Sequence, residues 1–174
     1  ALQECPTSGL LWGEDILTCP KQSQKSKSIE ALKRCDGNND PNIILAVARV
    51  FEKDNKIAKS RKWYMRAAAL CPQSGDIWAY YYRFELRQQV LQSRIIAKQN
   101  DDMAVEDGNA GTDDAAGTPT DDVPAEILAK CIESKPNRGA LWCAVSKQTE
   151  NRRLDAGTIL KKCVEKLTKL EAAQ

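Results

Sequence analysis

Cysteine is the residue type in this sequence with the widest chemistry, because thiolates bind zinc, form disulfides and act as nucleophiles. Seven cysteines occur, but the count is odd and no Cys-x-x-Cys pair is present. Zinc sites and disulfide frameworks usually show close or even-numbered patterns. Histidine is absent, which removes the commonest metal ligand and the usual base partner of a nucleophilic Ser or Cys. The sequence therefore disfavours an enzyme or a metal protein, and it predicts no cofactor and no small-molecule substrate.

The basic residues are the second set with a chemical role. The net charge is only +2, from 26 basic and 24 acidic residues, but eight of the acids lie within 101–122 and leave the rest of the chain with an excess of ten positive charges. The densest basic run consists of Lys53, Lys56, Lys59, Arg61, Lys62 and Arg66. Such a run is either a solvated helix face or a contact for an acidic protein segment or RNA phosphates. No stacking pattern of aromatic residues accompanies it, so an RNA contact would be to the backbone alone.

A motif that occurs three times indicates which elements position these residues. It has Pro at its first position, Gly at +3, Leu or Ile at +5 and Trp at +6, and we call it the anchor motif; it starts at Pro6, Pro72 and Pro136. Pro41 opens a related segment without the Trp. The four prolines are 35, 31 and 64 residues apart. A helix-turn-helix repeat of about 34 residues explains the first two intervals, and the third holds one repeat plus about 30 further residues.

A second landmark locates the extra residues. A small apolar residue recurs in the later helix of each repeat, at Cys35, Ala67, Cys131 and Cys163. Counted from Trp12, Leu45, Trp78 and Trp142, it lies 23, 22, 53 and 21 residues further on, so the extra residues interrupt the third repeat. They correspond to 99–124, whose acidic, Gly- and Thr-rich composition predicts a low-complexity insertion.

The predicted fold class is all-α: a solenoid of about four helix-turn-helix repeats with one acidic loop insertion. We expect the repeats at about 6–40, 41–71, 72–135 and 136–174, each stacking on its neighbours. No apolar run is long enough to span a bilayer, and we expect the chain to be part of a longer protein. The residues expected to pack between helices are Trp12, Leu45, Trp78, Trp142, Phe51, Phe84, Trp63, Cys35, Ala67, Cys131 and Cys163.

Two repeats carry a further signature. An aromatic residue and Glu stand at +6 and +7 from Leu45 and Trp78, in Ala48-Arg-Val-Phe51-Glu52 and Tyr82-Arg83-Phe84-Glu85. The second repeat adds Ser60-Arg61-Lys-Trp63-Tyr64-Met-Arg66-Ala67-Ala68. These motifs resemble the half-a-tetratricopeptide (HAT) repeat, a TPR-like repeat that belongs almost entirely to RNA-processing scaffolds. Three longer segments, at 1–12, 76–86 and 139–147, resemble the C-terminal repeats of the pre-mRNA-processing factor six family of splicing proteins.

The resemblance implies a nuclear, non-catalytic scaffold of the spliceosomal tri-snRNP, which bridges its component particles. It also implies other spliceosomal and snRNP proteins as partners, and no membrane. Within the same fold, the alternative is a HAT-repeat scaffold of mRNA 3′-end cleavage and polyadenylation or of ribosomal RNA processing. An enzyme or metal protein is the hypothesis from another class.

Overall fold

A computed structural model describes residues 2–35, 40–103 and 122–172, and the regular elements in these ranges are all helices. The predicted all-α class is therefore confirmed. The α-helices are α1 (Gly9–Thr18), α2 (Lys21–Arg34), α3 (Pro41–Lys53), α4 (Ile57–Leu70), α5 (Gly75–Met103), α6 (Val123–Ser134), α7 (Ala140–Ser146) and α8 (Ala156–Ala172), and a 3-10 helix, η2, spans Thr149–Asn151.

The second repeat shows how local sequence fixes the helix ends. The Asp40 side chain caps α3 by accepting hydrogen bonds from the backbone N–H groups of Asn42 and Ile43, 2.8 and 3.4 Å away. Pro41 stands in the first helical turn, where its missing N–H costs nothing. After α3, Asn55 turns the chain with a φ of 56°, and α4 then spans Ile57–Leu70.

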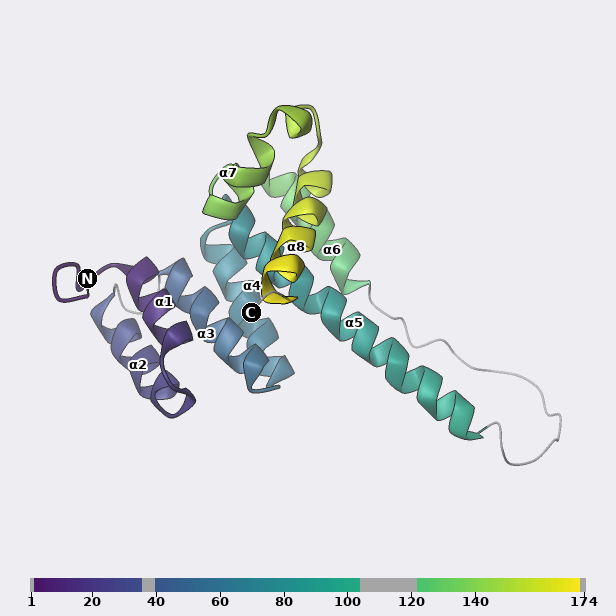
Figure 1. The fold of residues 1–174 in the computed structure, drawn as a ribbon, viewed down its shortest axis with the longest axis horizontal. Helices are drawn as coiled ribbons and strands as arrows, with labels where there is room; N and C mark the ends of the chain where they lie inside the picture. The colour runs from purple at the N-terminus through teal and green to yellow at the C-terminus, as the bar shows by residue number, and fades with distance from the viewer. Residues whose placement is uncertain (1, 36–39, 104–121, 173–174) are drawn as a thin grey trace.

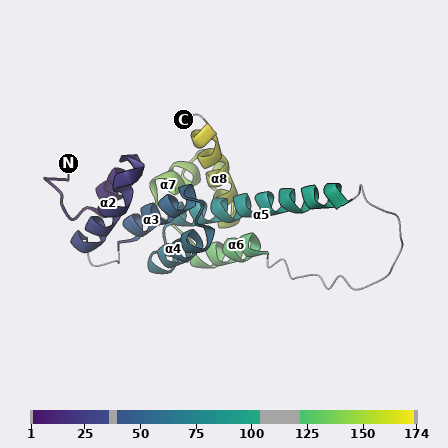
Figure 2. The same ribbon diagram turned by 90° about the horizontal axis from the view of Figure 1, so that it is seen from below.

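The helices pack as successive hairpins: α1 with α2, α3 with α4, α5 with α6 and α7 with α8 (Figures 1 and 2). Neighbouring hairpins touch through α1 and α3, through α4 and α5, and through α5 and α7. Two buried clusters result, one around Trp12 and Ile16 in the first hairpins and a larger one around Tyr64, Phe84 and Leu160. This stacking of hairpins on their neighbours is the architecture of an α-solenoid.

The anchor motif has a physical reason for its spacing. The indole Nε1–H of Trp12 donates to the carbonyl oxygen of Pro6 at 2.8 Å, and that of Trp78 donates to Pro72 at the same distance. The first and last residues of the motif are thus bonded to each other, and the ring is buried above the turn. The ring of Trp142, also buried, packs on Gly75, where any Cβ would collide with it.

The second and third copies of the motif also dock on each other. The backbone N–H of Gly75 donates to the carbonyl oxygen of Arg138 at 2.8 Å, and the Arg138 N–H donates to Gln73 at 3.0 Å. The Asp76 carboxylate accepts from the N–H groups of Leu141 and Trp142, at 3.2 and 2.7 Å, and so caps α7 from another repeat. The motif therefore joins repeats as well as starting helices.

The predicted insertion, 99–124, overlaps helical residues at both ends. Helix α5 continues to Met103, because no Gly or Pro interrupts it before that point. Helix α6 begins at Val123, where Asp122 caps it through the Ala125 N–H and Pro124 lies in its first turn. The central part of the predicted insertion, 104–121, lies outside the described residues.

Candidate protein-interaction surfaces

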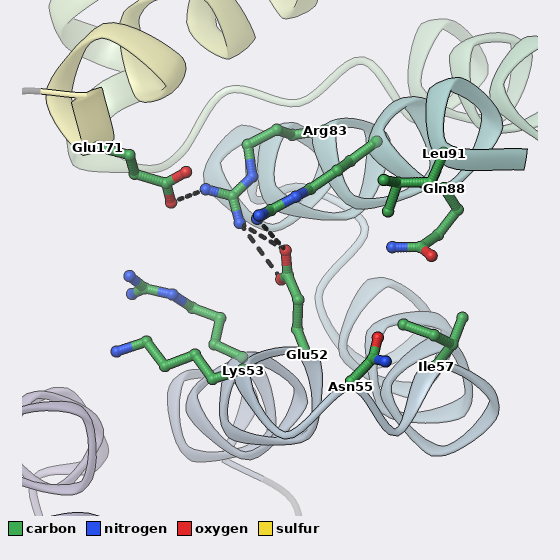
Figure 3. A pocket seen from close by; sticks show the side chains of 10 residues that line it. Glu52, Lys53, Asn55, Ile57, Arg83, Gln88, Leu91 and Glu171 are labelled. Carbon is green, nitrogen blue, oxygen red and sulfur yellow. Dashed lines mark hydrogen bonds and ion pairs between the residues drawn. The ribbon is translucent and has the colours of Figure 1, made fainter. Parts of the chain in front are cut away.

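The residues of the HAT-like signature form a polar network between repeats (Figure 3). The Glu52 carboxylate accepts a hydrogen bond from the Tyr64 hydroxyl at 2.6 Å and two from Arg83 Nη2 at 3.2 and 3.3 Å. Arg83 Nη1 pairs with Glu171, near the end of α8. The side chains of Arg83 and Glu52 are each 9% exposed. One arginine thus links three helices, α3, α5 and α8, which come from three of the predicted repeats.

Burial, followed by the nearby Glu52 carboxylate, raises the pKa of Tyr64 well above its ordinary value. The hydroxyl is therefore protonated at neutral pH and can serve as the donor to Glu52. The buried Glu52 carboxylate therefore accepts hydrogen bonds from both Tyr64 and Arg83, as a buried charge needs.

A second buried carboxylate occupies the equivalent position in the third repeat. Glu85, whose side chain is 3% exposed, accepts from Arg61 Nε at 2.6 Å and from Arg61 Nη2 at 2.7 Å. This bidentate hydrogen bond raises the pKa of Arg61. Arg61, which the sequence places among possible partner contacts, is therefore engaged within the fold.

The other residues of the predicted basic run lie in different surroundings. Lys56 pairs with Asp54 at 3.0 Å, and the Arg66 guanidinium lies 5.5 Å from the centre of the Trp63 ring. Lys59 and Lys62 are exposed on α4. Lys53 instead lines a pocket beside α5. The structure does not gather the run into one site.

The pocket that Lys53 lines has a volume of about 450 Å³ and lies between α3 and α5, with the end of α8 at its edge (Figure 3). Four cationic side chains line it against two anionic ones, Glu52 and Glu171. The cations are Arg49, Lys53, Arg83 and Arg87. The sequence analysis did not single out the three arginines as contacts. Glu52 could have indicated these arginines, because a carboxylate next to a packed aromatic residue is buried and needs a cationic partner from another helix.

A larger groove, of about 570 Å³, follows the face that α1, α3, α5 and α7 share, and α8 also contributes to its lining. Its walls are mainly apolar, and two of its residues, Leu10 and Leu170, are 62% and 53% exposed. No sequence motif indicates this groove, because the groove combines side chains from all four predicted repeats. Its apolar lining includes Leu10, Leu17, Leu45, Ile77, Leu141, Leu167 and Leu170.

The residues expected to pack between helices are mostly buried, and three of them, Leu45, Phe51 and Trp63, are half-buried at the edge of the cores. The rings of Phe51 and Trp63 stack with centres 6.4 Å apart. Burial raises the pKa of both Cys131 and Cys163 to about 12, so both are thiols at neutral pH. The buried members are Trp12, Trp78, Trp142, Phe84, Cys35, Ala67, Cys131 and Cys163.

Within 2–35, 40–103 and 122–172, no cluster of three or more His, Cys, Asp or Glu side chains is arranged to hold a metal ion. In the same ranges, none of the helices has both the length and the apolar character of a membrane span.

Stacked hairpins, inter-repeat motifs and open grooves define a helical-repeat protein of the α-solenoid class. No family model matches the chain. Over 152 residues, 87% of the chain, it is 36% identical to Protein STABILIZED1 of Arabidopsis thaliana. Over 141 residues, 81% of the chain, it is 34% identical to Pre-mRNA-processing factor 6 of Homo sapiens. It is also 28% identical, over 153 residues, to Pre-mRNA-splicing factor prp1 of Schizosaccharomyces pombe.

Over most of its length the chain is therefore homologous to a segment of Pre-mRNA-processing factor 6 and of STABILIZED1. This confirms the resemblance that its repeat motifs indicate. The chain spans 12% of the length of each of these two relatives.

Proposed function

We propose that this chain is a protein-interaction segment of a splicing scaffold, without catalytic activity of its own. The observation that carries the proposal is homology across 81% of the chain to a protein named Pre-mRNA-processing factor 6, together with a similar match to one named Pre-mRNA-splicing factor prp1. The chain would act in the nucleus as the C-terminal repeat segment of a factor that bridges the particles of the tri-snRNP. Its partners would be other spliceosomal proteins.

The apolar groove along α1, α3, α5 and α7 supports this function. A volume of about 570 Å³ with exposed leucines in its lining suits the apolar side chains of a partner helix or extended segment. Since the groove is made jointly by several repeats, it exists only while they are stacked. The repeat packing residues would then contribute to function by holding the groove in shape.

Affinity purification of the tagged full-length protein from nuclear extract tests both parts of the proposal. We expect snRNP proteins to be recovered, and Leu10→Glu with Leu170→Glu to reduce the recovery of at least one of them. The matched control is Ile29→Glu on α2, where the side chain is 46% exposed and outside the groove. Recovery of polyadenylation or pre-ribosomal factors without snRNP proteins would contradict the splicing role. Equal loss in the groove and control variants would contradict the groove.

A further inference from the structure

The second half of α5 carries a row of positive charge. Residues 87–98 contain three basic residues and no acidic one. Arg87, Arg94 and Lys98 are separated by seven and four residues, which are close to two turns and one turn of an α-helix. The three side chains therefore share one face, and all three are exposed. This part of α5 extends away from the packed hairpins (Figures 1 and 2).

Apolar side chains lie along the same face. Leu91 and Ile95 stand one helical turn apart and are 43% and 50% exposed. Leu91 follows Arg87 by four residues, and Ile95 precedes Lys98 by three, which are spacings that bring helical side chains together. Exposed large apolar residues that recur along one helix are uncommon on a free surface and are typical of interaction sites.

The charged pocket continues this face into the body of the molecule. Arg87 and Leu91 line the pocket together with Arg49 and Lys53 of α3. Arg87 Nη1 lies 3.8 Å from Glu52 Oε1. Arg83 Nε is buried and has no hydrogen-bond partner among the described residues. The pocket thus holds more positive charge than its own two acids neutralise, and it opens at the base of the projecting helix.

From this arrangement we propose that the pocket and the projecting half of α5 form a docking site for an acidic, amphipathic segment of a partner protein. We call this site the α5 basic face, made of Arg49, Lys53, Arg87, Leu91, Arg94, Ile95 and Lys98. Carboxylates of the partner pair with the cations, and its apolar side chains cover Leu91 and Ile95. The arginines suit this role because a guanidinium binds a carboxylate with two parallel hydrogen bonds.

The same cations could attract RNA phosphates, but two features favour protein. Leu91 and Ile95 gain nothing from a phosphate backbone, whereas apolar side chains of a peptide would bury them. Residues 87–98 also contain no aromatic side chain on which a base could stack. The site is independent of the splicing role, since it depends on charge and exposure alone.

Fluorescence anisotropy of the full chain with a defined probe tests the proposal. The probe is a labelled 21-residue peptide of three Leu-Glu-Glu-Ile-Leu-Asp-Glu repeats, compared with the same peptide carrying Gln and Asn for its acids, and with a 20-nucleotide oligouridine. We expect the acidic peptide to bind, and Arg87→Glu, Arg94→Glu and Lys98→Glu together to weaken it about tenfold or more. The neutral peptide should bind more weakly than the acidic one.

The matched control reverses three exposed lysines elsewhere, Lys33→Glu, Lys147→Glu and Lys161→Glu, with the same change in net charge. We expect it to change the Kd by less than about twofold. A further variant, Leu91→Ser with Ile95→Ser, keeps the charge and should weaken binding about threefold to tenfold. Melting curves of all variants establish that the fold is kept.

Three outcomes would overturn the proposal. Equal weakening by the control reversal would mean that only overall charge matters. Tighter binding of oligouridine than of peptide, lost on reversing Arg87, Arg94 and Lys98, would make the face an RNA site. Peptide binding seen only after Glu106, Asp107, Asp113 and Asp114 are changed to their amides would mean that acids of this chain occupy the face.

Discussion

The two halves of α5 lie in opposite surroundings. In the first half, the five residues from Tyr81 to Glu85 are all buried, although two of them are charged. In the second half, every residue from 89 to 99 is exposed, although several are large and apolar. The first half is surrounded by α4, α6 and α8, whereas the second extends past them (Figure 1).

This contrast shows that burial in α5 follows position in the array and not residue type. Charged residues in the first half must have partners inside the protein, and they have them in Glu52, Glu171 and Arg61. Apolar residues in the second half have no such cover among the described residues, and they suit a partner outside the chain. The first half of α5 thus stabilises the array, and the second half presents exposed side chains that a partner could contact.

The largest expected effect is on Trp78, in the first half of α5. We expect Trp78→Ala to lower the free energy of unfolding by about 4 kcal/mol, because it opens a cavity and removes the hydrogen bond to Pro72. Chemical denaturation monitored by circular dichroism would measure this. The matched variant in the second half, Leu91→Ala, should change stability by less than about 0.5 kcal/mol. A Trp78 effect below 1 kcal/mol would show that the motif does not pack as described.

Arg83 should give the next largest effect. We expect Arg83→Met to cost about 3 kcal/mol of unfolding free energy, because the Glu52 carboxylate loses its buried cation and keeps only the exposed Arg87, 3.8 Å away. Adding Glu52→Gln should recover part of the loss, which a double-mutant cycle would detect. Arg94→Met, on the exposed half, serves as the control and should be near neutral. If Arg83→Met and Arg94→Met were equally mild, the contrast between the halves would fail for charged residues.

The ion-pair partners of these buried charges could not be predicted from the sequence. Proline positions indicate where helices start, since Pro41 lies in the first turn of α3 and Pro124 in that of α6. The pairing of Arg61 with Glu85 was not predicted, because the two residues lie 24 positions apart on different helices. Residue spacing predicts which face of its own helix a side chain lies on. The contact between Arg61 and Glu85 depends instead on how two hairpins cross.

The extent of α5 was harder to predict for another reason. The composition becomes acidic at Asp101, which suggests an earlier end to the helix, but acidic residues do not by themselves break one. The apolar groove could not be predicted because two of its lining residues, Leu10 and Leu170, come from the first and last hairpins. Residues so far apart in the sequence line one groove only when all the hairpins are stacked.

A smaller effect should appear at high pH. Burial, followed by the charge of Glu85, raises the pKa of Tyr81 in the first half of α5 to about 12. An unfolded tyrosine has a pKa of about 10, so the unfolded state loses its proton first as the pH rises. Tyr81 therefore contributes stability below pH 10 that is lost progressively between about pH 10 and 12. We expect Tyr81→Phe to reduce the slope of unfolding free energy against pH in this window, and an unchanged slope would contradict the burial of its hydroxyl.

The smallest expected effect is at Ile95, and it tests the comparison from the other side. Ile95 is 50% exposed, so Ile95→Ser removes little buried apolar area and should change the free energy of unfolding by less than about 0.5 kcal/mol. The same change at Ile77, 2% exposed on the same helix, should cost several times more, since it also buries a hydroxyl. Parallel denaturation of the two variants measures the difference. A loss of about 2 kcal/mol at Ile95 would mean that the second half of α5 is packed within this chain, and its apolar side chains would then not be available to a partner.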